Sequence, residues 1–88
     1  MAQLKARLEG ATFDRAEAQG ADFHDADLCG ARLRDAQVQA ASFKNAQLQG
    51  ACLHNANLSL ANFSGTKLGF ARLDGASVGG GRTSLAPT

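Results

Sequence analysis

Residues 41–65 read ASFKN AQLQG ACLHN ANLSL ANFSG, five consecutive units of five residues. Alanine begins each unit, and Leu or Phe takes its third place. The same register extends outward without an insertion from Ala6 to Gly80, which makes fifteen units. Fourteen of them begin with Ala and the other with Thr66, while the third place holds eight Leu, four Phe, two Val and Ala18. Such a regular internal repeat decides the architecture.

Two apolar places in every five residues exclude the common periodic structures. A helix turns about 100° per residue, so the apolar stripe would wander around its whole surface. A flat strand alternates its faces with a period of two, so an odd repeat would reverse them at each unit. The chain must therefore bend after each unit, so that the first and third places always face inward. A coil of short sides, stacked at about the 4.8 Å strand spacing, satisfies this requirement.

A second period sets the number of sides. Phe23, Phe43 and Phe63 occupy third places at intervals of 20 residues. Twenty residues are four units, so we expect four sides per turn and three rings stacked along one side. The predicted core consists of the third-place residues Leu8, Phe13, Phe23, Leu28, Leu33, Val38, Phe43, Leu48, Leu53, Leu58, Phe63, Leu68, Leu73 and Val78.

Units such as Ala26-Asp27-Leu28 and Ala61-Asn62-Phe63 resemble the pentapeptide-repeat family, whose pattern is A(D/N)LXX. The resemblance implies an all-β fold, a right-handed quadrilateral parallel β-helix with a little under four coils. The sequence departs from the pattern at the second place, which weakens the side-chain bracing that the family pattern implies. The second places that comply are Asp22, Asp27, Asn57 and Asn62.

With 88 residues, 44% hydrophobic and 19% charged, the chain has the composition of one globular domain. We divide it into a lead-in (1–5), the repeat (6–80) and a flexible, Gly-rich tail (81–88). Both ends of the solenoid look thinly capped, and open ends expose apolar side chains and strand edges. Three interpretations remain: end-to-end stacking of copies, a monomer whose termini cover the ends, or a unit of a longer protein.

No arrangement typical of catalysis or metal binding emerges from the repeat. Cys29 and Cys52 fall on adjacent sides one coil apart, too far for a disulfide, so we predict two free thiols. No close Cys or His pair suggests zinc. Cys52 and His54 share a side, but the sequence indicates no pocket that would exclude water there. We therefore predict no catalytic residues, no metal and no cofactor.

The outward places leave two features of interest. On one side of the coil, basic residues form a candidate partner-binding patch, and Asp14, Asp35 and Asp74 on the same side reduce its net positive charge. Leu60 and Phe70 take fifth places, where polar residues or Gly are commoner. They are either exposed contacts or corner residues tucked under the next unit, and we favour the second interpretation. The residues of the patch are Arg15, Arg32, Arg34, His54 and Arg72.

These observations favour a non-enzymatic protein-interaction or scaffold module that binds an unidentified protein or stacks with its own copies. The family resemblance offers an alternative, a DNA mimic that binds a type II topoisomerase such as gyrase. Mimicry requires a strongly negative rod, whereas the formal charge here is +1. The same balance predicts no nucleic-acid binding, and no apolar stretch is long enough to span a membrane. Without a recognisable secretory signal, and with free thiols, we expect a cytoplasmic protein.

Overall fold

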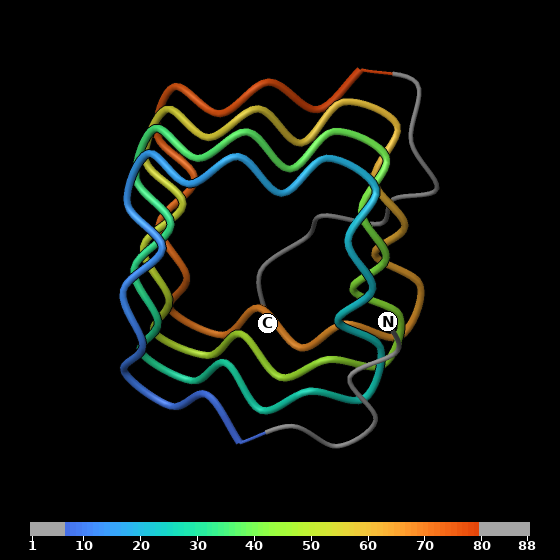
Figure 1. Ribbon diagram of the computed structural model, residues 1–88. Coiled ribbons are helices and arrows are strands. Elements are labelled where there is room, and N and C mark those ends of the chain that lie inside the picture. Colours follow the sequence, from blue (N-terminus) through green and yellow to red (C-terminus); the bar gives the residue numbers. More distant parts are fainter. Residues whose placement is uncertain (1–6, 80–88) are drawn as a thin grey trace.

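The computed structural model describes residues 7–79, which wind into a four-sided coil. Figure 1 looks into this coil, and successive turns overlie one another along all four sides. Each unit contributes a single bridge residue at its second place, followed after one residue by a two-residue turn. Eleven parallel bridges join residues 20 apart, from Arg7–Asp27 to Asn57–Ser77. Four units per turn, as expected from the phenylalanine spacing, is therefore confirmed.

Backbone hydrogen bonds tie each unit to the coil on either side. On one side of the coil, Leu33 N donates to Cys52 O at 2.7 Å, and Cys52 N donates to Ala31 O at 2.9 Å. The turn itself closes when Ala36 N donates to Leu33 O at 3.2 Å. The same pattern repeats from unit to unit, so the backbone groups that face a neighbouring coil are paired.

The corners are formed by the fifth place, which is left-handed at every described unit from Gly10 to Gly75. Six of these residues are glycine, with φ between 69° and 73°. A positive φ at the third residue of a four-residue turn is typical of a type II turn, which favours Gly or Asn. Eight are not glycine, yet adopt φ values of 57° to 63°: Arg15, Asp25, Asp35, Ala40, Asn45, Asn55, Leu60 and Phe70.

Second-place side chains brace the turns where they have an acceptor oxygen. Asp22 accepts a hydrogen bond from His24 N at 3.1 Å, and Asn62 accepts one from Ser64 N at 3.0 Å. Asp27 and Asn57 do the same for the fourth place of their own units. The four residues that fit the A(D/N)LXX pattern thus all satisfy the fourth-place N–H, which the backbone ladder leaves without a partner.

The interior is filled by first-place and third-place side chains. Phe23, Phe43 and Phe63 stack with ring centroids 5.2 and 5.0 Å apart and planes within 10° of parallel. Phe13 meets Phe23 edge-on at 5.9 Å. The buried third-place residues are Phe23, Leu28, Leu33, Val38, Phe43, Leu48, Leu53, Leu58, Phe63 and Leu68. No polar or charged residue is buried within the described range.

Burial falls off toward both ends of the described coil. Leu8, Phe13 and Leu73 are only partly buried, although they pack against the core. Val78, which we had placed in the core, is 38% exposed, because it lies in the last described unit, where fewer coils flank it. The predicted lead-in (1–5) and tail (81–88) lie outside the described residues.

Our preference for tucked corners at Leu60 and Phe70 was wrong. Leu60 is 63% exposed and Phe70 is 92% exposed. Both side chains extend into solvent from their corners, so neither residue is covered by the next unit. These two side chains are the large apolar groups that the middle of the coil displays to solvent.

Candidate functional site

The predicted patch belongs to one side of the coil, which we call the basic side: residues 11–15, 31–35, 51–55 and 71–75. Its outward columns are the second places (12, 32, 52 and 72) and the fourth places (14, 34, 54 and 74), since the third places face the core. Side chains from different coils therefore lie one above another at strand spacing. The ladder fixes the positions from which they extend.

In the first two coils of the basic side, two arginines contact one carboxylate. Arg34 N donates to Asp14 Oδ1 at 2.9 Å, and Arg34 Nη2 lies 3.3 Å from Asp14 Oδ2. Arg32 Nε lies 3.7 Å from the same Oδ2 atom. Burial opposes ionisation, but the hydrogen bonds and positive charge of Arg34 hold the pKa of Asp14 below its usual value. One carboxylate facing two guanidinium groups leaves this cluster with a net positive charge.

Above that cluster, Arg34, Cys52, His54 and Arg72 line an open hollow of about 290 Å³. None of the four is a carboxylate, and three of them carry side-chain nitrogen atoms. Asp74 lies nearby, with Oδ2 3.8 Å from Arg72 Nη2, but both side chains are about 70% exposed. Such an exposed pair contributes little and opens easily. The hollow therefore presents hydrogen-bond donors to an incoming anion.

The hollow brings together only part of the predicted patch. Arg34, His54 and Arg72 line it. Arg32 lies outside this lining, beside the Asp14 carboxylate that Arg34 also contacts. Arg15 is exposed at a corner with a φ of 61°. The sequence analysis did not predict the hollow beside Cys52 and His54. Whether an outer face is hollowed depends on the lengths of side chains from three successive coils, which the repeat does not specify. The alternation of long Arg side chains with the short Cys52 was the signal that could have indicated it.

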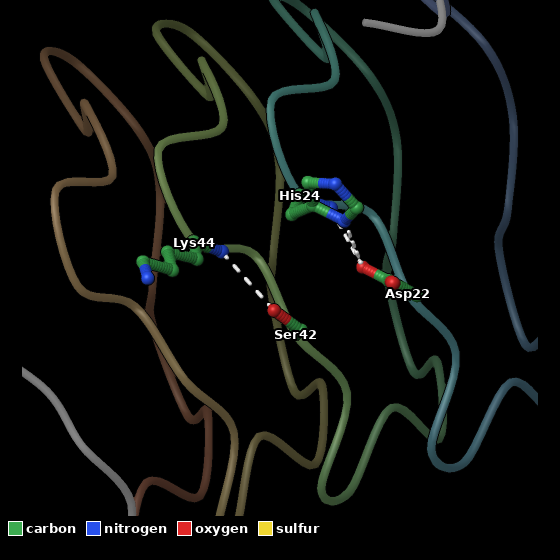
Figure 2. Close-up of polar contacts among 4 residues, drawn as sticks. All are labelled: Asp22, His24, Ser42 and Lys44. Atoms are coloured by element: carbon green, nitrogen blue, oxygen red, sulfur yellow. Dashed lines mark hydrogen bonds and ion pairs between the residues drawn. The ribbon is translucent and has the colours of Figure 1, made fainter. Parts of the chain in front are cut away.

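A second polar group, also missed from the sequence, lies on the side formed by residues 21–25, 41–45 and 61–65. His24 Nδ1 lies 2.6 Å from Asp22 Oδ1, and this contact with His24 holds the pKa of Asp22 below its usual value. Figure 2 shows this pair beside Ser42 and Lys44 of the next coil, where Lys44 N donates to Ser42 Oγ at 3.4 Å. Both contacts run within one unit, so they brace turns and do not link the serine hydroxyl to the imidazole.

Both cysteines are free thiols. Burial raises the pKa of Cys29, whose Sγ donates to Gln49 Oε1 at 3.2 Å in the next coil. Among residues 7–79, no three His, Cys, Asp or Glu side chains converge in a way that could hold a metal ion. That range also contains no helix long and apolar enough to cross a membrane.

The family model for pentapeptide repeats matches residues 5–39 and 41–80 in eight copies. A pentapeptide repeat protein, Rfr23, from the cyanobacterium Cyanothece 51142 superposes with a TM-score of 0.83 at 34% identity, over 84% of this chain and 50% of that one. A pentapeptide repeat protein from the thylakoid lumen of Arabidopsis thaliana gives 0.52 at 27% identity, over 91% and 59%. This chain thus spans half the length of the first of these proteins and 59% of the second. No curated protein matches it.

Proposed function

The chain belongs to the pentapeptide-repeat family and folds as its right-handed quadrilateral β-helix, and from this premise we propose that its basic side is a docking surface for an acidic partner protein. Members of the family are generally non-enzymatic structural or interaction modules. The observation that carries the proposal is the carboxylate-free hollow lined by Arg34, Cys52, His54 and Arg72. A guanidinium group pairs well with a carboxylate in two parallel hydrogen bonds.

The rigid ladder supports this role. A partner that meets Arg34 and Arg72 finds them extended from fixed backbone positions two coils apart, so little ordering of the backbone is required on binding. The hollow is open to solvent, which suits contact with a protein surface better than enclosure of a small substrate. We propose that the protein binds its partner without catalysis, in a reducing cytoplasmic environment where both thiols stay free.

The experiment uses a labelled hexaglutamate peptide as the probe and fluorescence anisotropy as the readout. We expect hexaglutamate to bind, with an affinity that falls as salt is raised, and hexaglutamine not to bind. The double variant Arg34→Gln/Arg72→Gln is expected to lose about tenfold in affinity, equivalent to about 1.4 kcal/mol.

The matched control is Lys44→Gln/Lys67→Gln, which removes the same charge from exposed places on two other sides. This control should bind as tightly as the parent. Equal losses in the two double variants would show that net charge alone attracts the peptide. Absence of hexaglutamate binding to the parent protein would overturn the proposal.

A second candidate function, end-to-end stacking with another copy, is favoured by the exposure at the ends of the described coil. Leu8, Leu73 and Val78 occupy core places but keep accessible surface. Light scattering behind size exclusion tests it: a mass that rises with concentration supports stacking, and a constant mass near 9.1 kDa excludes it. A topoisomerase-binding DNA mimic remains the weaker candidate, because an arginine-bearing side does not imitate phosphates.

A further inference from the structure

Phe70 combines two unfavourable features at one position. Its side chain is 92% exposed, and its backbone has a φ of 60°, which L-residues with large side chains rarely adopt. Glycine fills the same corner in the three coils below, at Gly10, Gly30 and Gly50. A Cβ placed on any of these three glycines would meet no atom within 4 Å, so this corner is open. Phe70 is therefore the only side chain that the described part of this corner presents.

The position of Phe70 relates it to the basic side. Phe70 precedes Ala71 and Arg72 in the chain, so its corner is the edge at which the basic side begins. Two residues of extended chain span about 7 Å, which places the Phe70 backbone one short step from the backbone of Arg72. Arg72 in turn lines the hollow. An exposed aromatic ring and a cluster of hydrogen-bond donors thus adjoin each other.

The other exposed apolar corner shows that this combination is local. Leu60 is also left-handed, with a φ of 63°, and is 63% exposed. It lies two corners away around the coil, and its sequence neighbours Ser59, Ala61 and Asn62 carry no charge. Leu60 thus shares the strain and the exposure of Phe70 without the adjoining arginines.

We propose that Phe70 and the hollow of Arg34, His54 and Arg72 form one composite surface that binds an extended acidic peptide segment carrying an aromatic residue among its carboxylates. This inference rests on the proposed function of the basic side and adds the apolar anchor. The carboxylates face the donors of the hollow, and the aromatic side chain packs on the Phe70 ring. The bare glycine corner below Phe70 leaves room for the peptide backbone to approach closely.

Charge complementarity identifies the occupant. The lining of the hollow contains no carboxylate. Arg34 and Arg72 each contact a carboxylate beside the hollow, but these contacts are partly exposed, so an acidic segment adds partners for the guanidinium groups and a basic or neutral segment does not. A purely acidic segment would pair with the arginines but leave the Phe70 ring in water. Only a segment with both kinds of side chain covers both features, and aromatic residues at the centre of an interface commonly supply much of its affinity.

The test compares two peptides, Glu-Glu-Phe-Glu-Glu and Glu-Glu-Ser-Glu-Glu, by fluorescence anisotropy on three proteins: the parent, Phe70→Gly and Leu60→Gly. Glycine suits the left-handed backbone at both positions, so both variants should fold, and circular dichroism checks this. The parent should prefer the Phe peptide by about two- to tenfold, the range expected for an aromatic pair. Phe70→Gly should bind the two peptides equally while keeping its affinity for the Ser peptide, and Leu60→Gly should retain the preference.

The outcomes separate this inference from the function on which it rests. If the parent binds both peptides equally well, the aromatic anchor is wrong but the basic side still binds acidic segments. A preference that persists in Phe70→Gly would assign the anchor to another residue and overturn the role of Phe70. If neither peptide binds the parent, both the anchor and the proposed function fail. Phe70→Asn, which also tolerates the left-handed backbone, provides a second variant for the same comparison.

Discussion

The interior columns and the corners of this coil repeat with the same period but differ in what they accept. In the middle of the coil, every buried first-place residue is Ala, and every buried third-place residue is Leu, Phe or Val. At the corners, seven residue types adopt the same left-handed conformation, with φ between 57° and 73°. Corner geometry is thus constant while corner chemistry varies.

The difference shows which part of the unit determines the conformation. A left-handed residue that is not glycine is unfavourable by roughly 1–2 kcal/mol, and asparagine and aspartate less so. Eight corners bear such residues, so burial of the interior and the backbone ladder must outweigh their combined strain. The outer corners are consequently free to carry residues chosen for contact, and Phe70 is the extreme case.

The largest effect should come from the interior. Phe43 is fully buried and stacks between Phe23 and Phe63, so Phe43→Ala is expected to destabilise by about 3–5 kcal/mol in urea unfolding. Phe13 is only half-buried and makes one edge-on contact, so Phe13→Ala should cost clearly less. Gln39→Ala serves as the outer control and should be almost neutral. It removes one part-buried hydrogen bond from Nε2 to Gln37 Oε1, but it also removes a buried Oε1 that has no hydrogen-bond partner.

Equal losses for Phe43→Ala and Phe13→Ala would contradict the gradient of burial from the middle of the coil to its ends. A large loss for Gln39→Ala would contradict the division between inward and outward places. Circular dichroism at the same denaturant concentrations would show whether each variant still unfolds in one transition.

The next effect contrasts two glycine corners with nearly the same φ, Gly65 at 69° and Gly50 at 71°. An alanine Cβ at Gly65 would overlap Oδ1 of Asn45 in the coil below, whereas at Gly50 it would meet no atom within 4 Å. Gly50→Ala should therefore cost about 0.5–1 kcal/mol, because left-handed strain of roughly 1–2 kcal/mol is partly offset by the smaller entropy cost of ordering alanine, roughly 0.5–1 kcal/mol. Gly65→Ala should cost about 1 kcal/mol more, because Asn45 must move.

A double-mutant cycle isolates the overlap. In an Asn45→Gly background, Gly65→Ala should cost no more than Gly50→Ala does in the parent. Thermal unfolding of the four proteins measures the coupling. An unchanged cost of Gly65→Ala in that background would mean that the Asn45 side chain does not limit this corner.

Much of this architecture follows from the sequence, for a physical reason. The first and third places repeat because they are buried, and Phe23, Phe43 and Phe63 reveal the number of sides because aromatic rings stack in register. The outer surface carries no such constraint. The exposure of Leu60 and Phe70 and the hollow beside Cys52 depend on side-chain conformations that no periodicity encodes. The pattern predicted which side was basic but not which of its arginines were already paired with Asp14.

A third prediction concerns the outward carboxylates that brace turns. The pKa of Asp22 is lowered by hydrogen bonds with His24, and that of Asp27 by hydrogen bonds with Cys29. A carboxylate whose pKa is lower in the folded protein stabilises it above the unfolded pKa, and this contribution is lost as pH falls through the folded pKa. Stability should thus decline as pH is lowered below about 4.

Asp22→Asn/Asp27→Asn tests this assignment without removing the braces, because Asn57 and Asn62 already accept the same backbone hydrogen bond. The double variant should show a shallower decline of melting temperature between neutral and acidic pH than the parent. Parallel pH curves for the two proteins would assign the acid sensitivity to other carboxylates.

The smallest expected change in stability is a gain, and it tests most directly whether the corners tolerate different residue types. Leu60→Gly relieves left-handed strain of roughly 1–2 kcal/mol but adds the entropy cost of ordering a glycine, roughly 0.5–1 kcal/mol. The net change should be a stabilisation of about 0.5–1 kcal/mol, seen as a melting temperature a few degrees higher. Leu60→Ala, which keeps a Cβ and therefore the strain, should gain none of it. If Leu60→Gly instead destabilises the protein, the exposed leucine contributes packing that outweighs its strain, and the corners are as constrained as the interior.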